Sequence, residues 1–321
     1  MKFILATSAI ASAAAIGVLL CAAAASAKPT YVIIDAGQVN AINDADTVVG
    51  TNDQPYYAFI RTVDGSVTKF TVQGHYTQPT SINNTGVVAG TYIISGQMDV
   101  FLRATDGTIS TPHIPGKSKS VFLNNNGDIA GFYVEEDGPR RGYLRTADGN
   151  LERIDIPGSA ETIVSAINDA GAVAGTDADQ DGFIRAADGT IKTFRVFGSD
   201  GTYVTGLNNE GAVSGIYVVG YSFLGGFIRS PNGTIQTFHF KGCPGYLSYF
   251  PFLPSGMLNA SGVTAGLCAG RNPRAFVRHP NGTIGRFHVP GQGLFAEPMG
   301  VNAAGVIAGY SGGGGFMRFP R

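Results

Sequence analysis

The stretch that decides the fold runs from Ile167 to Val196 and reads INDAGAVAGTDADQDGFIRAADGTIKTFRV. Four short apolar segments alternate in it with turn residues: the first ends at the Ile-Asn pair, and Val-Ala-Gly, Phe-Ile-Arg and Ile-x-x-Phe-x-Val follow. The Asp-Gly pair favours a tight hairpin turn, because Gly adopts positive φ without steric cost. The stretch therefore predicts four short antiparallel strands.

This unit recurs along the chain. Its Asn returns at Asn43, Asn83, Asn124, Asn168, Asn208, Asn259 and Asn302. The third segment ends each time in Arg, at Arg61, Arg103, Arg145, Arg185, Arg229, Arg278 and Arg318. Successive Asn residues are 40, 41, 44, 40, 51 and 43 positions apart. Four strands in about 40 to 45 residues is the size of a β-propeller blade, so we predict an all-β, seven-bladed propeller.

The two ends of the chain predict how the ring closes. The seventh unit stops at Phe319-Pro320-Arg321, after its third segment, and has no fourth strand. The segment Tyr31 to Asp35 precedes the first unit and matches the pattern of a fourth strand. A ring can pair its first strand into its last blade and leave only short edges. We therefore predict closure by the N-terminal strand.

The first 27 residues have the pattern of a cleaved export signal. A basic start at Lys2 leads into an apolar stretch and ends at Ala25-Ser26-Ala27, a small-residue cleavage site. Residues 28–321 then form a single propeller domain in the periplasm or outside the cell, and no later apolar run is long enough to span a bilayer. Without Lys2, 21 basic residues face 23 acidic ones, which argues against a nucleic-acid partner.

The repeat resembles the HAF-repeat family of extracellular proteins, named for a His-Ala-Phe run that opens the third strand. Two copies keep the Ala-Phe part, at Ala58-Phe59 and Ala275-Phe276, and three have Gly-Phe, at Phe183, Phe227 and Phe316. No copy carries the His. The resemblance covers the whole mature chain and implies a secreted repeat protein; it implies no activity and no site residues.

The repeated Asn and Arg residues and the histidines bear on catalysis. One Asn and one Arg per blade is what a structural hydrogen-bond set requires, and we prefer that interpretation to a binding ring. His113, His239 and His288 occupy one equivalent position in the fourth strands of three blades. They are therefore expected around the perimeter, too far apart for one metal or catalytic centre. No linear catalytic motif is present, so we favour a protein that is not an enzyme, although loops from several blades can assemble a site without one.

One local motif suggests a metal. Asp177, Asp179 and Asp181 place carboxylates at alternate positions before Gly182, as in the first half of a calcium loop. Asp188 stands at the twelfth position, but the intervening strand puts it about 20 Å away. We therefore consider both an incomplete Ca²⁺ site and a solvated acidic hairpin tip.

The longest insertion, Gly242 to Met257, joins the fifth and sixth units. It carries Tyr246, Tyr249, Phe250 and Phe252. Exposed aromatic rings can stack on a sugar or bury against a protein partner; equally, these rings can fold back over the edge of the blade.

The insertion also contains Cys243, and Cys268 follows the second strand of the next unit. Both positions are expected on one face of one blade. Because an exported protein meets oxidising conditions, we predict a Cys243–Cys268 disulfide that fixes the insertion.

Three function classes remain open. The first is an exported binding module for an unknown glycan or protein, using the face that carries the blade-to-blade loops. The second is a lyase- or hydrolase-type enzyme with a site built from several loops on that same face, and the third is a purely structural surface repeat.

Overall fold

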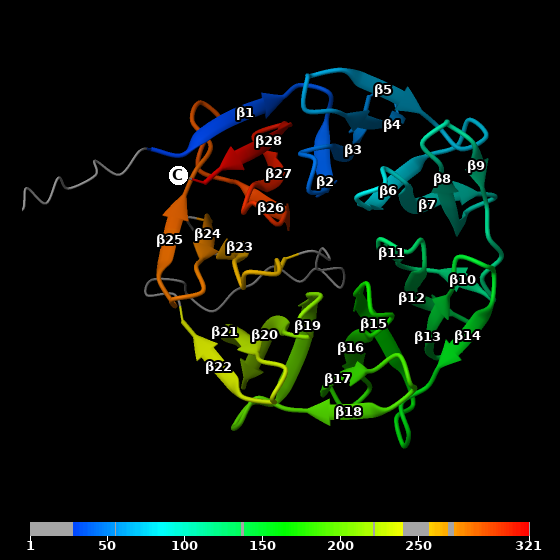
Figure 1. The fold of residues 1–321 in the computed structure, drawn as a ribbon, viewed down its shortest axis with the longest axis vertical. Helices are drawn as coiled ribbons and strands as arrows, with labels where there is room; N and C mark the ends of the chain where they lie inside the picture. The colour runs from blue at the N-terminus through cyan, green and yellow to red at the C-terminus, as the bar shows by residue number, and fades with distance from the viewer. Residues whose placement is uncertain are drawn as a thin grey trace, which may run out of the picture.

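The computed structural model describes residues 28–54, 56–135, 138–220, 222–239, 257–268 and 273–320. Their strands form seven small antiparallel sheets arranged in a ring around a central axis (Figure 1). The described residues contain no helix, and so none that could cross a membrane. The chain is therefore a seven-bladed β-propeller, as the repeat predicts.

The strands are numbered in chain order and grouped here by blade. Blade 1 contains β2 (Gln38–Ile42), β3 (Val48–Asp53), β4 (Tyr56–Arg61) and β5 (Val67–Phe70). Blade 2 contains β6 (Thr77–Ile82), β7 (Val88–Ile94), β8 (Gln97–Arg103) and β9 (Ile109–Ser110). Blade 3 contains β10 (Lys117–Ser118), β11 (Phe122–Leu123), β12 (Ile129–Val134), β13 (Arg140–Arg145) and β14 (Leu151–Ile154). Blade 4 contains β15 (Thr162–Ile167), β16 (Val173–Asp177), β17 (Gly182–Arg185) and β18 (Ile191–Phe194).

The remaining blades complete the circle. Blade 5 contains β19 (Gly201–Leu207), β20 (Val213–Val219), β21 (Ser222–Arg229) and β22 (Ile235–Phe238). Blade 6 contains β23 (Thr264–Cys268), β24 (Arg274–Arg278) and β25 (Ile284–Phe287), with an isolated bridge between Leu258 and Thr264 on the inner side. Blade 7 contains β26 (Glu297–Val301), β27 (Ile307–Ser311) and β28 (Gly314–Phe319), and its outermost strand is β1 (Thr30–Ile34).

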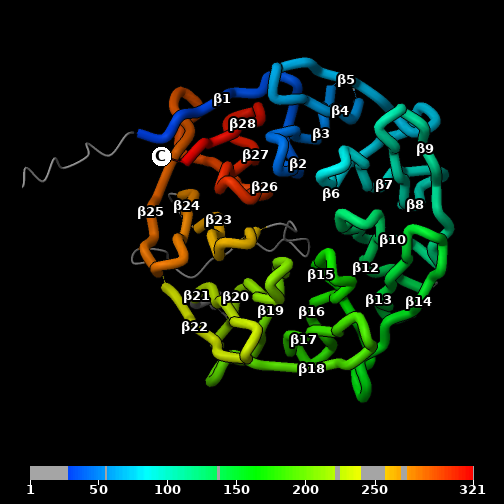
Figure 2. The backbone as a smooth tube through the Cα atoms, viewed as in Figure 1, coloured from blue at the N-terminus to red at the C-terminus, as the bar shows by residue number. Residues whose placement is uncertain are grey.

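The ring closes through its two ends, as predicted. Strand β1 runs antiparallel to β28, with Thr30 opposite Phe319 and Ile34 opposite Gly315. Figure 2 shows the blue N-terminal segment lying along the outer edge of the red C-terminal blade. This pairing gives blade 7 its fourth strand, so no blade is left open at the chain ends.

Within a blade, the repeated Gly of Val-Ala-Gly on the second strand lets the first strand and the aromatic ring of the third strand pack closely against it. A Cβ added at Gly175 would lie 2.0 Å from the carbonyl oxygen of Ile163 and 2.8 Å from the ring of Phe183. Phe183 is fully buried, as are its equivalents Phe59, Phe101, Tyr143, Phe227 and Phe316. The small residue is therefore required by the close approach of the inner strand and the third-strand ring.

Neighbouring blades pack together through an aromatic ring on the fourth strand of one blade and the third-strand ring and repeated Arg of the next. The ring of Phe194 on β18 meets Phe227 of the next blade edge-to-face at 5.9 Å, and the Arg229 guanidinium lies 5.0 Å from the centre of the Phe194 ring. The same stacking joins Arg103 to Phe70, Arg278 to Phe238 and Arg318 to Phe287. These Arg side chains therefore have the structural role that the repeat predicts.

The two faces of the ring differ in their connections. The turns that begin at each repeated Asn join the first and second strands and emerge on one face, here named the turn face. The second-to-third-strand turns and the connections between blades emerge on the opposite side, here named the loop face. Because successive strands are antiparallel, this alternation holds in every blade that has four strands.

Candidate functional site

The seven repeated Asn residues form a closed ring of hydrogen bonds. The Nδ2 group of each donates to the backbone carbonyl oxygen of the Asn in the next blade, at 2.9 to 3.2 Å, and Asn302 donates to Asn43 to complete the circle. All seven are at most 5% exposed. This Asn ring links every blade to its neighbour.

The other half of each amide holds the local turn. In blade 4, Oδ1 of Asn168 accepts the backbone N–H of Ala172 at 3.0 Å, and the remaining six blades repeat this bond. Both ends of the side chain are thus used inside the protein. The structural interpretation of the repeated Asn is confirmed.

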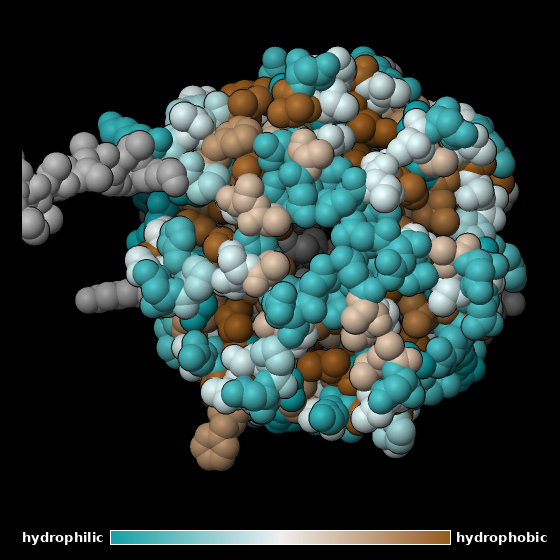
Figure 3. All heavy atoms as spheres, in the orientation of Figure 1, coloured by the Kyte–Doolittle hydropathy of each residue, from teal (hydrophilic) through white to brown (hydrophobic). Residues whose placement is uncertain are grey.

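A second, incomplete arc of polar side chains lies above the Asn ring on the turn face. It consists of Asp44, Asn84, Asn125, Asp169 and Asn209, whose Oδ1 atoms accept backbone N–H groups of the preceding blade. Figure 3 shows hydrophilic side chains gathered around the central hollow. Blades 6 and 7 have Ala260 and Ala303 at this position, so the side-chain arc ends there.

The predicted calcium loop forms the turn between β16 and β17, and calcium binding there stays a prediction. No set of three His, Cys, Asp or Glu side chains in the described residues could hold a metal ion, and Asp177, Asp179 and Asp181 lie within those residues. Asp177 turns inward, is buried, and accepts the backbone N–H of Asp181 at 2.9 Å. Burial, with smaller contributions from Asp181 and Asp179, raises the pKa of Asp177.

A cation of the protein itself lies at this hairpin tip. The Arg195 guanidinium donates to the carboxylate of Asp181, to the carbonyl oxygen of Asp179 at 2.7 Å and to that of Asp200 at 2.8 Å. Arg195 comes from the end of the fourth strand, so the spacing of the aspartates alone could not reveal it. An internal ion pair thus compensates one of the three carboxylates of the tip, that of Asp181.

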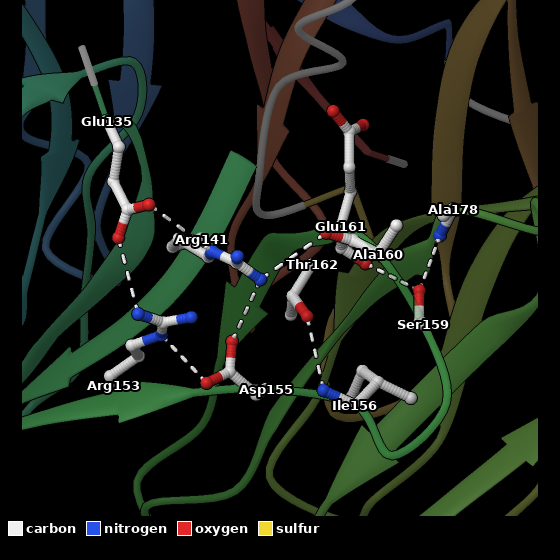
Figure 4. A network of polar contacts seen from close by, with 10 residues as sticks. All are labelled: Glu135, Arg141, Arg153, Asp155, Ile156, Ser159, Ala160, Glu161, Thr162 and Ala178. Carbon is white, nitrogen blue, oxygen red and sulfur yellow. Dashed lines mark hydrogen bonds and ion pairs between the residues drawn. The ribbon is translucent and has the colours of Figure 1, made fainter. Parts of the chain in front are cut away.

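A second polar network lies on the loop face at the join between blades 3 and 4 (Figure 4). Glu135, Arg153, Asp155 and Arg141 form a closed circuit of ion pairs, with N···O distances of 3.2, 2.7, 3.5 and 3.8 Å in that order. Arg141 also donates to the carbonyl oxygen of Ala160 in the connection to blade 4. Every charge in the circuit has an opposite neighbour, which favours a structural role.

The histidines are distributed as predicted. His239 lies 2.9 Å from the hydroxyl of Tyr217 in its own blade, at the position that Asp155 and Arg195 occupy in blades 3 and 4. This position therefore ties the end of the fourth strand to its own blade. His75 lies in the connection between blades 1 and 2, where its ring packs against Tyr92 with the centroids 6.4 Å apart.

Several predicted residues fall outside the described ranges. The aromatic candidates Tyr246, Tyr249, Phe250 and Phe252, and Cys243, are among them. Cys268 is described, and it is buried at the end of β23. The Cys243–Cys268 disulfide and the role of the aromatic insertion therefore stay predictions.

The exposed apolar side chains concentrate on the loop face. Nine large hydrophobic residues are exposed in the described ranges. Three lie in blade-to-blade connections, Phe197, Leu294 and Phe295, and three lie at the ends of strands beside second-to-third-strand turns, Tyr56, Ile93 and Val219. The turn face has two, Val63 in a third-to-fourth-strand turn and Val67 where that turn enters β5. The two faces thus differ in apolar character as well as in their connections.

Phe197 is the clearest member of this set. It is fully exposed at the tip of a turn in which the Ser199 N–H donates to the Val196 carbonyl oxygen at 3.0 Å. The equivalent turns after blades 3 and 6 have Pro157 and Pro290 there, each followed by a Gly with positive φ, as Phe197 is. Proline suits that turn position, so the turn does not require an aromatic ring. Comparing the repeats at this position would have singled out Phe197.

The central channel is lined by the inner strands. A cavity of about 150 Å³ lies in it beside the Asn ring. Ile42, Ile82, Leu123, Ile167, Leu207 and Val301, each one residue before a ring Asn, form part of its wall. At the loop-face end of β26, Glu297 accepts a hydrogen bond from the Tyr310 hydroxyl at 2.5 Å.

Comparison with solved structures identifies proteins of similar fold. A streptogramin B lyase matches with a TM-score of 0.63 at 15% identity, over 91% of this chain and 98% of that chain. Virginiamycin B lyase from Staphylococcus aureus matches with a TM-score of 0.62 at 17% identity, over 92% and 99% of the two chains. TolB from Acinetobacter baumannii matches with a TM-score of 0.54 at 12% identity, over 89% and 64%.

This chain shares their propeller fold. No family model and no curated protein matches its sequence. Sequence identities of 12 to 17% show a shared fold but not a shared activity, because one fold can hold many unrelated functional sites. The function must be argued from the surfaces of this chain.

Proposed function

We propose that the protein is an exported interaction module that binds a protein partner through its loop face. The supporting observation is the asymmetry of the two faces: the exposed Phe197, Leu294 and Phe295 all lie in blade-to-blade connections on one side. Exposed aromatic and aliphatic side chains of this kind act as anchors when a partner covers them. The export signal at residues 1–27 and the resemblance to HAF-repeat proteins are part of the same proposal.

The lyase or hydrolase alternative has one local observation in its favour, the Glu297–Tyr310 pair near the channel mouth. Burial, and then the neighbouring Glu297, raises the pKa of Tyr310 well above its usual range. The phenol therefore keeps its proton at neutral pH and donates a hydrogen bond rather than accepting a proton. That hydroxyl proton is already donated to Glu297, so this pair offers no free acid or base, and we propose binding.

Site-specific photocross-linking in the producing cells tests the proposal. A photoreactive amino acid replaces Phe197 or Leu294 on the loop face, and Val63 on the turn face serves as the matched control, because it is 66% exposed. We expect a discrete protein adduct from positions 197 and 294 and none from position 63. Adducts of equal strength from both faces, or none from the loop face, would contradict the proposal.

A further inference from the structure

The exposed Phe197 lies on a turn whose backbone is held in place. The Val196 carbonyl oxygen accepts the Ser199 N–H at 3.0 Å, and Gly198 has a φ of 76°. This bond and this positive φ are those of a type II turn, in which Phe197 takes the second of four positions. The Val196 N–H donates to Thr202 Oγ1 at 2.9 Å, and Ser199 Oγ donates to the Val196 carbonyl oxygen at 2.8 Å. The turn is therefore braced by its own residues.

The same turn is fixed between the hairpin tips of blades 4 and 5. Before it, Arg195 donates to the carbonyl oxygen of Asp179 in the β16–β17 hairpin at 2.7 Å. After it, the Asp200 N–H donates to the Val218 carbonyl oxygen at 2.8 Å, and the Asp200 carboxylate accepts the Gly220 N–H of the β20–β21 hairpin. A side chain on a rigid backbone loses little conformational freedom when a partner covers it. Phe197 is thus preorganised for binding.

The Phe197 ring serves no internal packing. Its relative exposure is 103%, so the ring loses no accessible surface when the chain folds. The equivalent turns after blades 2, 3 and 6 have Pro115, Pro157 and Pro290 at this position. An aromatic ring stabilises a protein mainly through the area that it buries. Here that area is available only to another molecule.

Uncompensated negative charge lies beside the ring. Asp179 and Asp200 are exposed, and no Lys, Arg or His among the described residues forms an ion pair with either carboxylate. The exposed Val219 belongs to the hairpin that contacts Asp200. We name Phe197, Val219, Asp179 and Asp200 together the Phe197 patch. It combines apolar side chains with two carboxylates that have no cation.

This charge limits what can cover the ring. A carboxylate that is taken out of water without a positive group costs free energy, and like charges across an interface repel each other. An acidic protein or an anionic lipid surface is therefore disfavoured at the Phe197 patch. A surface that carries cations around an apolar pocket can instead bury the ring and pair with both carboxylates.

We propose that the Phe197 patch docks a protein partner that has an apolar pocket with Arg or Lys at its rim. The Phe197 ring enters the pocket, and Asp179 and Asp200 pair with the cations around it. An aromatic anchor surrounded by polar and charged contacts is the usual arrangement of an interface hot spot. The inference rests on the proposed loop-face interaction and adds the chemistry of the partner.

A display selection on the purified protein tests that chemistry. The probe is a library of disulfide-cyclised peptides of random sequence, from which peptides that bind the Phe197→Pro variant are removed. We expect the retained peptides to combine apolar side chains with Arg or Lys. Retained peptides that are acidic or uncharged, or a selection that retains none, would overturn the proposal.

The Phe197→Pro variant also tests whether the ring has a structural role. Proline suits this turn position, and the ring packs against nothing, so the Tm of the variant should equal or exceed that of the parent. A clearly lower Tm would assign the ring to folding and would contradict the proposal.

Paired charge variants separate the patch from the net charge of the protein. Asp179→Asn with Asp200→Asn should lower the affinity for a retained peptide about tenfold at low salt, because two rim contacts are lost. Asp106→Asn with Asp188→Asn removes the same charge from exposed hairpins of the turn face and should leave the affinity unchanged. Equal losses in the two pairs would exclude a specific role for the patch carboxylates.

Two further results distinguish this inference from the loop-face interaction itself. The protein should not bind vesicles of phosphatidylcholine and phosphatidylglycerol in equal parts; binding that Phe197→Pro abolishes would assign the patch to a membrane instead. In the photocross-linking experiment, the adduct from position 294 should weaken when Phe197→Pro is added. An adduct that persists unchanged would overturn this inference while the loop-face interaction stands, whereas no adduct from any loop-face position would contradict both.

Discussion

Each Asn of the ring uses both halves of its side-chain amide, and this makes the ring sensitive to single substitutions. Asn168 donates to the Asn208 carbonyl oxygen at 3.2 Å and accepts the Ala172 N–H at 3.0 Å. We expect Asn168→Ala to destabilise the fold by about 2 kcal/mol, because it leaves the half-buried Ala172 N–H without its partner and removes the contact to the next blade, where the Asn208 carbonyl oxygen keeps only the Gly211 N–H. Differential scanning calorimetry measures the effect.

The matched control is Asn232→Ala. Asn232 is exposed in a hairpin and accepts the Thr234 N–H at 3.0 Å, so water can replace its side chain. The control should cost well under half as much as Asn168→Ala. Equal losses in the two variants would show that the Asn ring does not brace the blades.

The buried carboxylate of Asp177 gives a prediction about pH. Its pKa is raised, chiefly by burial, so the folded state binds this proton more tightly than the unfolded state does. The associated stability is present below the ordinary Asp pKa and is lost as pH rises through the raised value. Asp177→Asn retains an acceptor for the Asp181 N–H and removes the charge.

We therefore expect Asp177→Asn to raise Tm at pH 7 and to lose this advantage near pH 3. The control is Asp179→Asn, at an exposed position of the same turn, which should leave Tm unchanged at both values. A lower Tm for Asp177→Asn at pH 7 would mean that the carboxylate stabilises the tip through Arg195 by more than its burial costs.

At the scale of single elements, the sequence predicts the strands correctly wherever the signal comes from neighbouring residues in the chain. Turn residues and short apolar runs predicted four strands in each blade, and they form in blades 1, 2, 4, 5 and 7. The five register shifts of the inner strands were not predicted. Each falls three residues before a ring Asn, where no Gly or other turn residue is repeated that could mark it in the sequence.

Contacts between residues far apart in the sequence account for features of the candidate sites that the sequence does not predict. The spacing of Asp177, Asp179 and Asp181 suggested calcium, but Arg195, which follows the fourth strand, lies at the tip. No role for Phe197 is predicted from the sequence, because one aromatic residue in a loop is a weak signal by itself. It becomes informative only when its turn is compared with those of Pro157 and Pro290.

At the scale of the whole molecule, the closed ring produces two unlike faces and a channel. The turn face is braced by the Asn ring and carries polar side chains, whereas the loop face carries most of the exposed apolar ones. The proposed loop-face interaction depends on closure, because the order of the loops around the ring exists only if blade 7 contains both chain ends. The missing fourth strand of the seventh unit and the fourth-strand pattern at Tyr31 to Asp35 together predict this closure from the sequence.

Disulfide trapping of the two chain ends tests closure most directly. Thr30 and Phe319 are directly opposed in the β1–β28 ladder, so their Cα atoms are about 4.5 to 5.5 Å apart, within reach of a disulfide. Thr30→Cys with Phe319→Cys should cross-link on mild oxidation, as shown by peptide mapping, and raise Tm. Thr30→Cys with Met317→Cys is displaced by two residues and should not cross-link. Failure of the first pair, or equal cross-linking of both, would contradict the closed ring.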